Sequence, residues 1–240
     1  MKAIFELIST LQGDAHRLNP TEIYNEGWMT RLLVYHSVEE KLTVKDIAFG
    51  ELSNWTSEGL ISSPFVFADK YREGYTHADM ALGDFSINFE QRGEIIVNDD
   101  AKLFGIIEAK MGSPLSKGTT NAPNYNQASR NIACIAYNTR DTNINSFFGV
   151  VAPLSTLDKH EVAEKLKSSF YARQIEDRYD MYEEENAIWE SKGEVYWRVL
   201  AMQTFMISYE EWIEAFDGKE CHNELNEFYS QCLKWNRIKA

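Results

Sequence analysis

Glu108 and Lys110 are the side chains best spaced for chemistry, because residues two apart in a strand project to the same side. The pattern of an acid, any residue and a lysine occurs five times in the chain. Only Glu108-Ala109-Lys110 ends an apolar segment typical of a buried strand, KLFGIIEAKM. The other four lie in polar or helical surroundings that favour a solvated charged face: Glu39-Glu40-Lys41, Asp100-Ala101-Lys102, Glu190-Ser191-Lys192 and Asp217-Gly218-Lys219.

Two interpretations of the Glu108–Lys110 pair stay open from this strand alone. Burying a charge is costly unless the charge is paired or coordinated, so charges at the end of a core strand need a reason. The first interpretation is a partly exposed ion pair, since networks of charges also occur at such places. The second is a functional site, which requires a further polar group nearby.

Asp79 favours the functional site. It begins the preceding strand-like region, HADMALGDFSINFE, and a neighbouring strand would bring it beside Glu108. Two carboxylates together with phosphate oxygens suit Mg²⁺, which prefers hard oxygen ligands. The ion would lower the pKa of a bound water, and Lys110 would orient that water or stabilise developing negative charge. Asp84 is the alternative ligand, because sequence does not settle the register of this strand.

The elements that must hold these residues form an α/β pattern. The segment that ends at Glu108 has apolar residues on both faces, as a central strand covered on both sides would have. Asn19-Pro20-Thr21 is typical of a helix start with Pro in the first turn. The further predictions are an N-terminal amphipathic helix, a helix over roughly 23–38, short strands or loops within 42–75 such as Pro64-Phe65-Val66-Phe67, a helix over about 124–137 and a strand over 147–151.

The remainder of the chain, from residue 157, is predicted to be mostly helical, including EVYWRVLAMQTFMISYEEWIEAF. We therefore expect one domain over 1–240, with an α/β core over 20–153 and a helical C-terminal extension over 157–240 packed on it. The core would contain a helix, a mixed central sheet of about four or more strands, a helix and a strand.

Asp79, a spacer and Glu108-Ala109-Lys110 closing an apolar strand resemble the PD-(D/E)XK, or restriction-endonuclease-like, nuclease superfamily. The resemblance covers about residues 20–153 and implies a restriction-endonuclease-like core. One departure is plain, because Ala78 stands before Asp79 where the motif has Pro.

Two further positions agree with the superfamily. It often has an acidic residue on its first core helix, where this chain carries Glu26, with Glu22 one turn earlier as the alternative. It also often has a polar residue on the helix after the acid-x-Lys strand, where Gln127 and Arg130 lie.

The resemblance implies hydrolysis of phosphodiester bonds with Mg²⁺ or Mn²⁺. We expect DNA, rather than RNA, to be the substrate. It assigns the metal ion to Asp79, Glu108 and the backbone carbonyl of Ala109, and water activation to Lys110. Under the same resemblance, Glu26 would hold a water or a second ion. Gln127 and Arg130 would position the phosphate backbone.

The net charge of −13 is an objection to a nucleic-acid enzyme. Its distribution softens the objection, because residues 109–140 contain no Asp or Glu and carry Lys110, Lys117, Arg130 and Arg140. Lys117 is therefore predicted to bind nucleic acid with Gln127 and Arg130. Cutting both strands of a duplex would favour a homodimer.

The sequence also predicts where the protein works. It has no run of 18 apolar residues and no signal-peptide pattern at its N-terminus, so we expect no membrane span. Three cysteines without a CxxC pair indicate reduced thiols in a cytoplasmic protein.

Two other functions compete with a nuclease. One is a catalytically inactive protein of the same fold that binds nucleic acid or a basic protein, since residues 158–240 carry 18 acids against 11 bases. The other is an unrelated α/β protein with a simple Glu108–Lys110 ion pair, which predicts that Asp79 lies far from Glu108.

Overall fold

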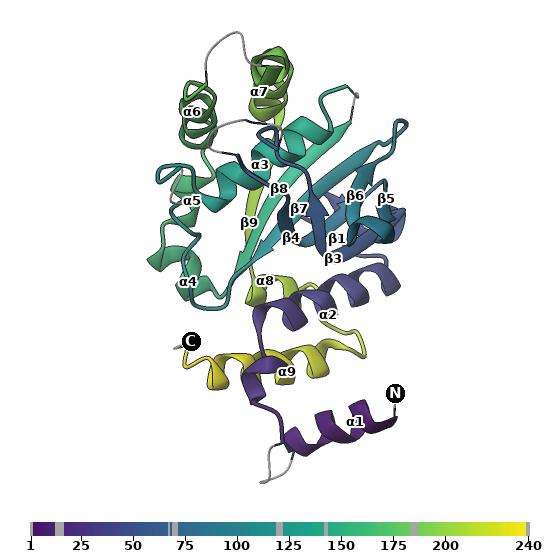
Figure 1. The fold of residues 1–240 in the computed structure, drawn as a ribbon. Coiled ribbons are helices and arrows are strands. Elements are labelled where there is room, and N and C mark those ends of the chain that lie inside the picture. The colour runs from purple at the N-terminus through teal and green to yellow at the C-terminus, as the bar shows by residue number, and fades with distance from the viewer. Residues whose placement is uncertain are drawn as a thin grey trace.

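The computed structural model of the chain has three layers, with a central sheet between two layers of helices (Figure 1). It describes residues 2–12, 17–66, 68, 72–118, 122–141, 144–182 and 187–238. The α/β class expected from the alternation of strand and helix patterns is therefore confirmed.

The central sheet is mixed and, within the described residues, has seven strands in the order β5-β6-β3-β4-β7-β8-β9. The middle pairs β3–β4 and β4–β7 are antiparallel, whereas β7–β8 and β8–β9 are parallel. The strands are β3 (Asn54–Ile61), β4 (Thr76–Gly83), β5 (Phe85–Asn88), β6 (Glu94–Val97), β7 (Leu103–Ala109), β8 (Asn145–Ala152) and β9 (Gln203–Ser208). A separate two-stranded ribbon consists of β1 (Thr43–Val44) and β2 (Ile47–Ala48).

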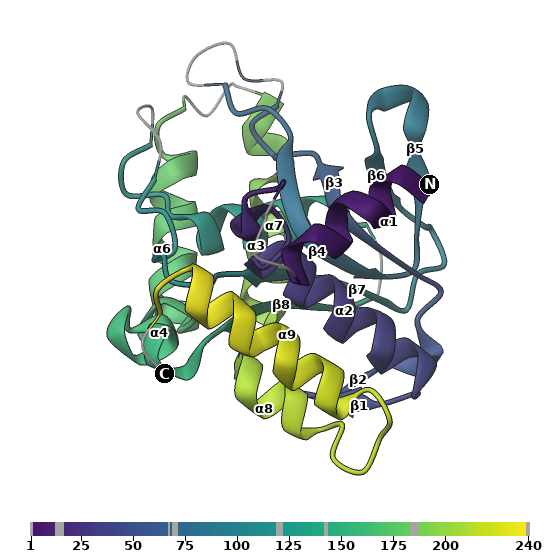
Figure 2. The same cartoon turned by 90° about the horizontal axis from the view of Figure 1, so that it is seen from below.

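Helices cover both faces of the sheet (Figures 1 and 2). One face packs against α3 (Gln127–Asn138), on which α6 (Ser168–Tyr179) and α7 (Lys192–Ala201) pack in turn. The opposite face packs against α2 (Glu26–Glu39) and α8 (Tyr209–Glu214), and α9 (His222–Trp235) packs on these two helices. Shorter helices are α1 (Lys2–Ser9), α4 (Leu154–Lys159) and α5 (Val162–Lys165), with 3₁₀ turns at Thr10–Gln12, Pro20–Glu22, Phe49–Glu51, Phe89–Gln91 and Ala187–Ser191.

β7 lies at the centre of the sheet, as its sequence predicts. Phe104 and Ile106 pack into the core beneath α3, and Ile107 and Ala109 pack into the core beneath α2. A strand with apolar groups on both faces is stable only where both faces are covered, which fixes the end of β7 between two helical layers.

The predicted helices are present with small shifts of their ends. The helix expected over 23–38 is α2, which starts at Glu26 because the Asn25 side chain caps the backbone N–H of Trp28. The helix expected over 124–137 is α3, which Asn126 caps in the same way. Both caps place the first helical residue one position after an asparagine.

One prediction about an element is wrong. Residues 203–208 form strand β9 rather than helix, and this strand pairs with β8, so the extension after residue 157 is not all helical and completes the core sheet. Its residues Thr204, Phe205 and Ile207 favour a strand, but helical patterns on both sides hid it. Pro64–Val66 forms a turn, in agreement with the predicted short strands or loops, and Phe67 lies outside the described residues.

Among the described helices, none is both long and apolar enough to cross a membrane. The three cysteines, which the sequence predicts to be reduced, are buried and free.

Candidate active site

Glu108 is the centre of the candidate site. It is the second-last residue of β7, and its side chain is fully buried. Its Oε1 accepts hydrogen bonds from Lys110 Nζ and from Gln127 Nε2, the latter at 2.6 Å, and its Oε2 accepts one from Asn131 Nδ2 at 2.9 Å. A buried carboxylate with three donors is satisfied in hydrogen bonding but remains without access to water.

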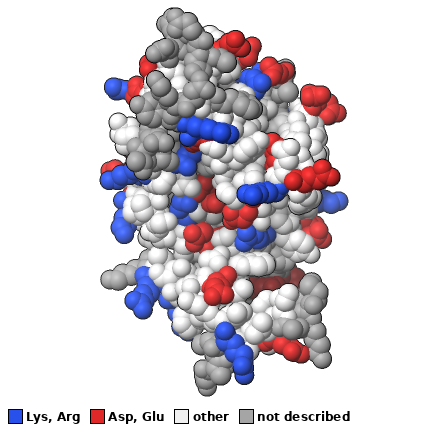
Figure 3. All heavy atoms as spheres, viewed as in Figure 1, with Lys and Arg blue, Asp and Glu red and all other residues white. Residues whose placement is uncertain are grey.

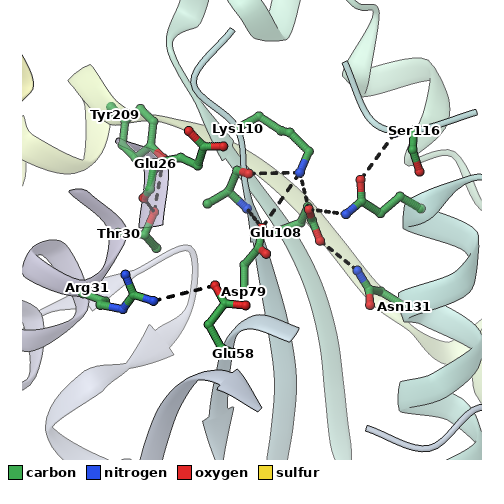
Figure 4. Close-up of polar contacts among 12 residues, drawn as sticks. Glu26, Thr30, Arg31, Glu58, Asp79, Glu108, Lys110, Ser116, Asn131 and Tyr209 are labelled. Carbon is green, nitrogen blue, oxygen red and sulfur yellow. Dashed lines mark hydrogen bonds and ion pairs between the residues drawn. The ribbon is translucent and has the colours of Figure 1, made fainter. Parts of the chain in front are cut away.

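Asp79 lies beside Glu108 on the neighbouring strand. The β4–β7 register pairs Met80 with Ile107, so its next step places Asp79 opposite Glu108. Asp79 Oδ2 accepts a hydrogen bond of 2.9 Å from the backbone N–H of Ala109. A simple Glu108–Lys110 ion pair is therefore not what the structure contains, because a second carboxylate joins it (Figure 4).

The two carboxyl groups repel each other. Burial first, and the charge of Asp79 second, raise the pKa of Glu108 to about 8. A pKa of about 8 favours the protonated form of Glu108 at neutral pH, as burial beside a second carboxylate does.

Lys110 provides the positive charge between them. Its Nζ donates to Glu108 Oε1 and to the Ala109 carbonyl at 3.1 Å, and it lies 3.9 Å from Asp79 Oδ2. Burial disfavours the ammonium, but the Glu108 and Asp79 carboxylates outweigh burial and raise the pKa of Lys110 above its usual value. The lysine backbone N–H donates to the Val151 carbonyl at 2.9 Å, so β8 fixes its position.

Glu26 reaches the same end of the sheet from the other helical layer. It is the first residue of α2, and its charge acts on the Lys110 ammonium. Tyr209 anchors this end of α2, because its buried hydroxyl lies 3.1 Å from Thr30 Oγ1 and donates to the Glu26 carbonyl at 3.5 Å. Figure 4 shows Glu26 with these two residues beside the Glu108–Lys110 group.

α3 contributes two amide side chains to Glu108. Gln127 and Asn131 lie one turn apart and therefore on one face of the helix. The amide nitrogen of each donates to a different oxygen of Glu108, and Gln127 Oε1 also accepts from the Ser116 backbone N–H at 3.3 Å. Asn131 was not among the predicted site residues, because a buried asparagine inside a helix has no distinctive pattern in sequence.

The remaining predicted residues lie elsewhere. Arg130 forms an ion pair with Glu73 at 3.1 Å, on another face of α3 from Gln127 and Asn131. Lys117 is exposed in the loop before α3. Glu22, the alternative to Glu26, is exposed in the 3₁₀ turn before α2. The prediction that Arg130 and Lys117 contact nucleic acid stays a prediction.

Asp84, the alternative to Asp79, lies at the opposite end of β4. Its carboxylate accepts hydrogen bonds from the Ser53 hydroxyl and from the backbone N–H groups of Lys102 and Leu103, the latter two at 2.8 and 3.2 Å. Partial burial disfavours the carboxylate, but these hydrogen bonds outweigh burial and hold the pKa of Asp84 below its usual value. Asp84 therefore anchors backbone and is not part of the group around Glu108.

The donor set fits a hard divalent cation in part. Among the described residues, no group of three or more His, Cys, Asp and Glu side chains lies close enough to hold a metal ion. Two adjacent carboxylates nevertheless suit Mg²⁺ or Mn²⁺, because Mg²⁺ commonly takes one or two carboxylates and completes its shell with water and substrate oxygens. Asp79 and Glu108 would be those ligands, with the Ala109 carbonyl beside them.

Comparisons of the chain with protein-family models, with curated proteins and with solved structures find no match.

Proposed function

We propose that the protein is a metal-dependent nuclease that hydrolyses phosphodiester bonds in DNA, on a restriction-endonuclease-like core. The observation that supports this most is the meeting of Asp79, Glu108 and Lys110 at the end of β7. Two carboxylates and one lysine are the charges that hydrolysis of a phosphodiester requires when a divalent ion joins them.

Each side chain of the group would have a separate role in the reaction. Lys110 would orient the attacking water or stabilise the negative charge that develops on the phosphate. Gln127 and Asn131 hold the Glu108 carboxylate in one orientation through its two oxygens. Glu26 would hold a water at the mouth of the site.

Mg²⁺ or Mn²⁺ bound by Asp79 and Glu108 would supply Lewis acidity and lower the pKa of a bound water. The raised pKa of Glu108 agrees with this assignment, because a divalent cation would favour the charged carboxylate that burial and Asp79 disfavour.

The charge of the molecule constrains how substrate would bind. On the face seen in Figure 3, the acidic and basic side chains of the described residues are interspersed. Phosphate contacts would therefore come from individual cations near the site, and affinity would fall as salt is added.

The test is cleavage of labelled single-stranded, duplex and supercoiled DNA by the purified protein. We expect cleavage with Mg²⁺ or Mn²⁺, none with a chelator, and none by Lys110→Ala under any of these conditions. Lys219→Ala is the matched control and should cleave like the original chain, because this lysine pairs with Glu40 at the end of α2 opposite to Glu26. Binding of nucleic acid without cleavage, unchanged by Lys110→Ala, would instead support a non-catalytic protein of the same fold.

A further inference from the structure

The outer face of α2 carries exposed aromatic side chains beside the candidate site. Trp28 is 42% exposed and Tyr35 is 48% exposed. They are seven residues apart, which places them on one side of the helix roughly 10 Å from each other. Arg31 lies between them on the same side.

Arg31 is fixed in place by three neighbours. Its Nε donates to Ser57 Oγ at 2.8 Å, and its guanidinium lies 5.3 Å from the centre of the Trp28 ring. Gly27 leaves room for the guanidinium, because a Cβ there would lie 3.0 Å from Arg31 Nη1. An arginine that is oriented in advance loses little side-chain entropy when it binds a further group.

Glu58 is the fourth neighbour of Arg31, and its contact is loose. The Arg31 Nη2 to Glu58 Oε1 distance is 3.7 Å, longer than a hydrogen bond, and the Glu58 side chain is 56% exposed. Exposed ion pairs of this kind contribute little free energy. A phosphate group can therefore compete for the guanidinium.

This face adjoins the candidate site through both the helix and the sheet. Glu26, which acts on Lys110, begins the same helix two residues before Trp28. Ser57, which holds Arg31, pairs across β3 and β4 with Met80, the residue after Asp79. Figure 4 shows Arg31 and Glu58 next to the Asp79 side of the site.

We propose that Trp28 and Arg31 bind an unpaired stretch of nucleic acid next to the candidate site, with a base stacked on Trp28 and a backbone phosphate paired with Arg31. Tyr35 extends the same platform along α2. This inference rests on the proposed nuclease function and deepens it, because it names single-stranded DNA as the substrate class. Base faces inside a duplex are already stacked, whereas every unpaired base offers its face to an aromatic ring.

The experiment measures binding of fluorescent oligonucleotides to the Lys110→Ala protein with Ca²⁺ in place of Mg²⁺, so that cleavage does not interfere. Single-stranded DNA, single-stranded RNA of the same sequence and the corresponding duplex are compared. Trp28→Ala should weaken single-strand binding by about ten- to a hundredfold, as loss of one stacked base does. Trp28→Phe should retain most of the affinity, because it keeps an aromatic face.

Trp197→Ala is the matched control. Trp197 is 73% exposed on α7, in the opposite helical layer, and its loss should leave binding unchanged. Arg31→Ala should weaken binding and make it less sensitive to salt, whereas Arg31→Lys should recover only part, because a guanidinium holds phosphate through two bonds.

The surface proposal fails if single-stranded DNA does not bind, if Trp28→Ala binds as tightly as Trp197→Ala, or if duplex or RNA binds more tightly than single-stranded DNA. These results can coexist with cleavage by the original chain, in which case the nuclease function stands without this surface. Binding through Trp28 with no cleavage under any divalent ion would leave the surface in place and reject the nuclease.

Discussion

Asp79 lies on β4 and Asp84 directly follows this strand, and each accepts hydrogen bonds from the backbone at one end of β7. Asp84 has a hydroxyl and two amides around its carboxylate, so its charge is fully compensated and its pKa is lowered. Asp79 faces another carboxylate, the pKa of which it helps to raise.

The Asp84 carboxylate therefore stabilises the fold, whereas the Asp79 carboxylate destabilises it. Aspartate at the Asp84 end of β4 is favoured because its hydrogen bonds need the charge. At the Asp79 end the buried Glu108 opposes Asp79, the side chain of which is 27% exposed, so the two negative charges destabilise each other. Lys110 offsets part of this repulsion, and a divalent cation would offset more of it.

The largest expected difference between Asp79 and Asp84 is in the rate of DNA cleavage. Asp79→Asn should lower the rate of DNA cleavage by about a hundredfold or more, because it removes one of the two predicted metal ligands. Asp84→Asn should leave the rate within roughly threefold, since it changes only backbone anchoring at the far end of β4. Initial rates with saturating Mg²⁺ measure both, and equal losses in the two variants would remove the distinction.

For the free energy of unfolding, we expect Asp84→Asn to have the larger effect and Asp79→Asn the smaller one. Asp84→Asn should lower the free energy of unfolding by about 2 kcal/mol, because charge-assisted hydrogen bonds to two backbone amides are lost. Asp79→Asn should leave the free energy unchanged or raise it, because repulsion with Glu108 disappears. Urea unfolding without divalent ions measures both, and destabilisation by Asp79→Asn as large as that of Asp84→Asn would contradict the interpretation.

Glu108 and Asp84, near the two ends of β4, should also contribute to stability at different pH values. The folded pKa of Glu108 is raised from 4.5 to about 8, so the folded state binds this proton more tightly than the unfolded chain. Its contribution to stability is greatest below pH 4.5 and is lost as pH rises to about 8. The lowered pKa of Asp84 acts in the opposite direction, because its contribution is lost as pH falls below its usual value.

Thermal unfolding between pH 5 and 8 isolates the Glu108 end. Between these values the melting temperature should fall by roughly 5 °C more in the original chain than in Asp79→Asn, which lacks the charge that raises the Glu108 pKa. Mg²⁺ at pH 8 should restore part of this loss in the original chain only. A parallel fall in both proteins would show that the carboxyl pair does not titrate as described.

The smallest effect should come from Asn131. Asn131→Ala removes the donor to Glu108 Oε2 while leaving Gln127 in place, so cleavage should fall about tenfold, as loss of one hydrogen bond to a charged group implies. Glu108 would then be held through one oxygen only. Asn138→Ala, at the other end of α3, serves as the control, and its cleavage rate should stay near that of the original chain.

The sequence predicted the strand that carries the site better than the residues around it. β7 was recognisable because its apolar residues cover both faces, and this local property fixes both its place in the sheet and its end at Ala109. Asp79 and Asp84 could not be separated by sequence, because the choice depends on the β4–β7 register. Gly83 ends β4 with a φ of 127°, and a Cβ at this position would collide with the Leu103 carbonyl, so a glycine is needed where the register is set.

Residues whose roles depend on distant partners were beyond sequence reasoning. Arg130 was predicted from its position on α3, but its partner Glu73 lies 57 positions earlier in the chain and cannot be paired with it by pattern. β9 was missed because its neighbour β8 is more than fifty residues away, and the pairing rather than the local sequence makes it a strand. Asn131 can be assigned to the site only once its hydrogen bond to Glu108 is known.

β9 also has a consequence for the order in which the protein is made. A ribosome that has released the chain only as far as Ala152 has delivered Asp79, Glu108 and Lys110, yet β8 then has an unpaired edge and Tyr209 has not arrived to anchor the start of α2. Synthesis must pass residue 209 before the sheet closes. The support of the group around Glu108 is therefore complete only after β9 and Tyr209 have been made.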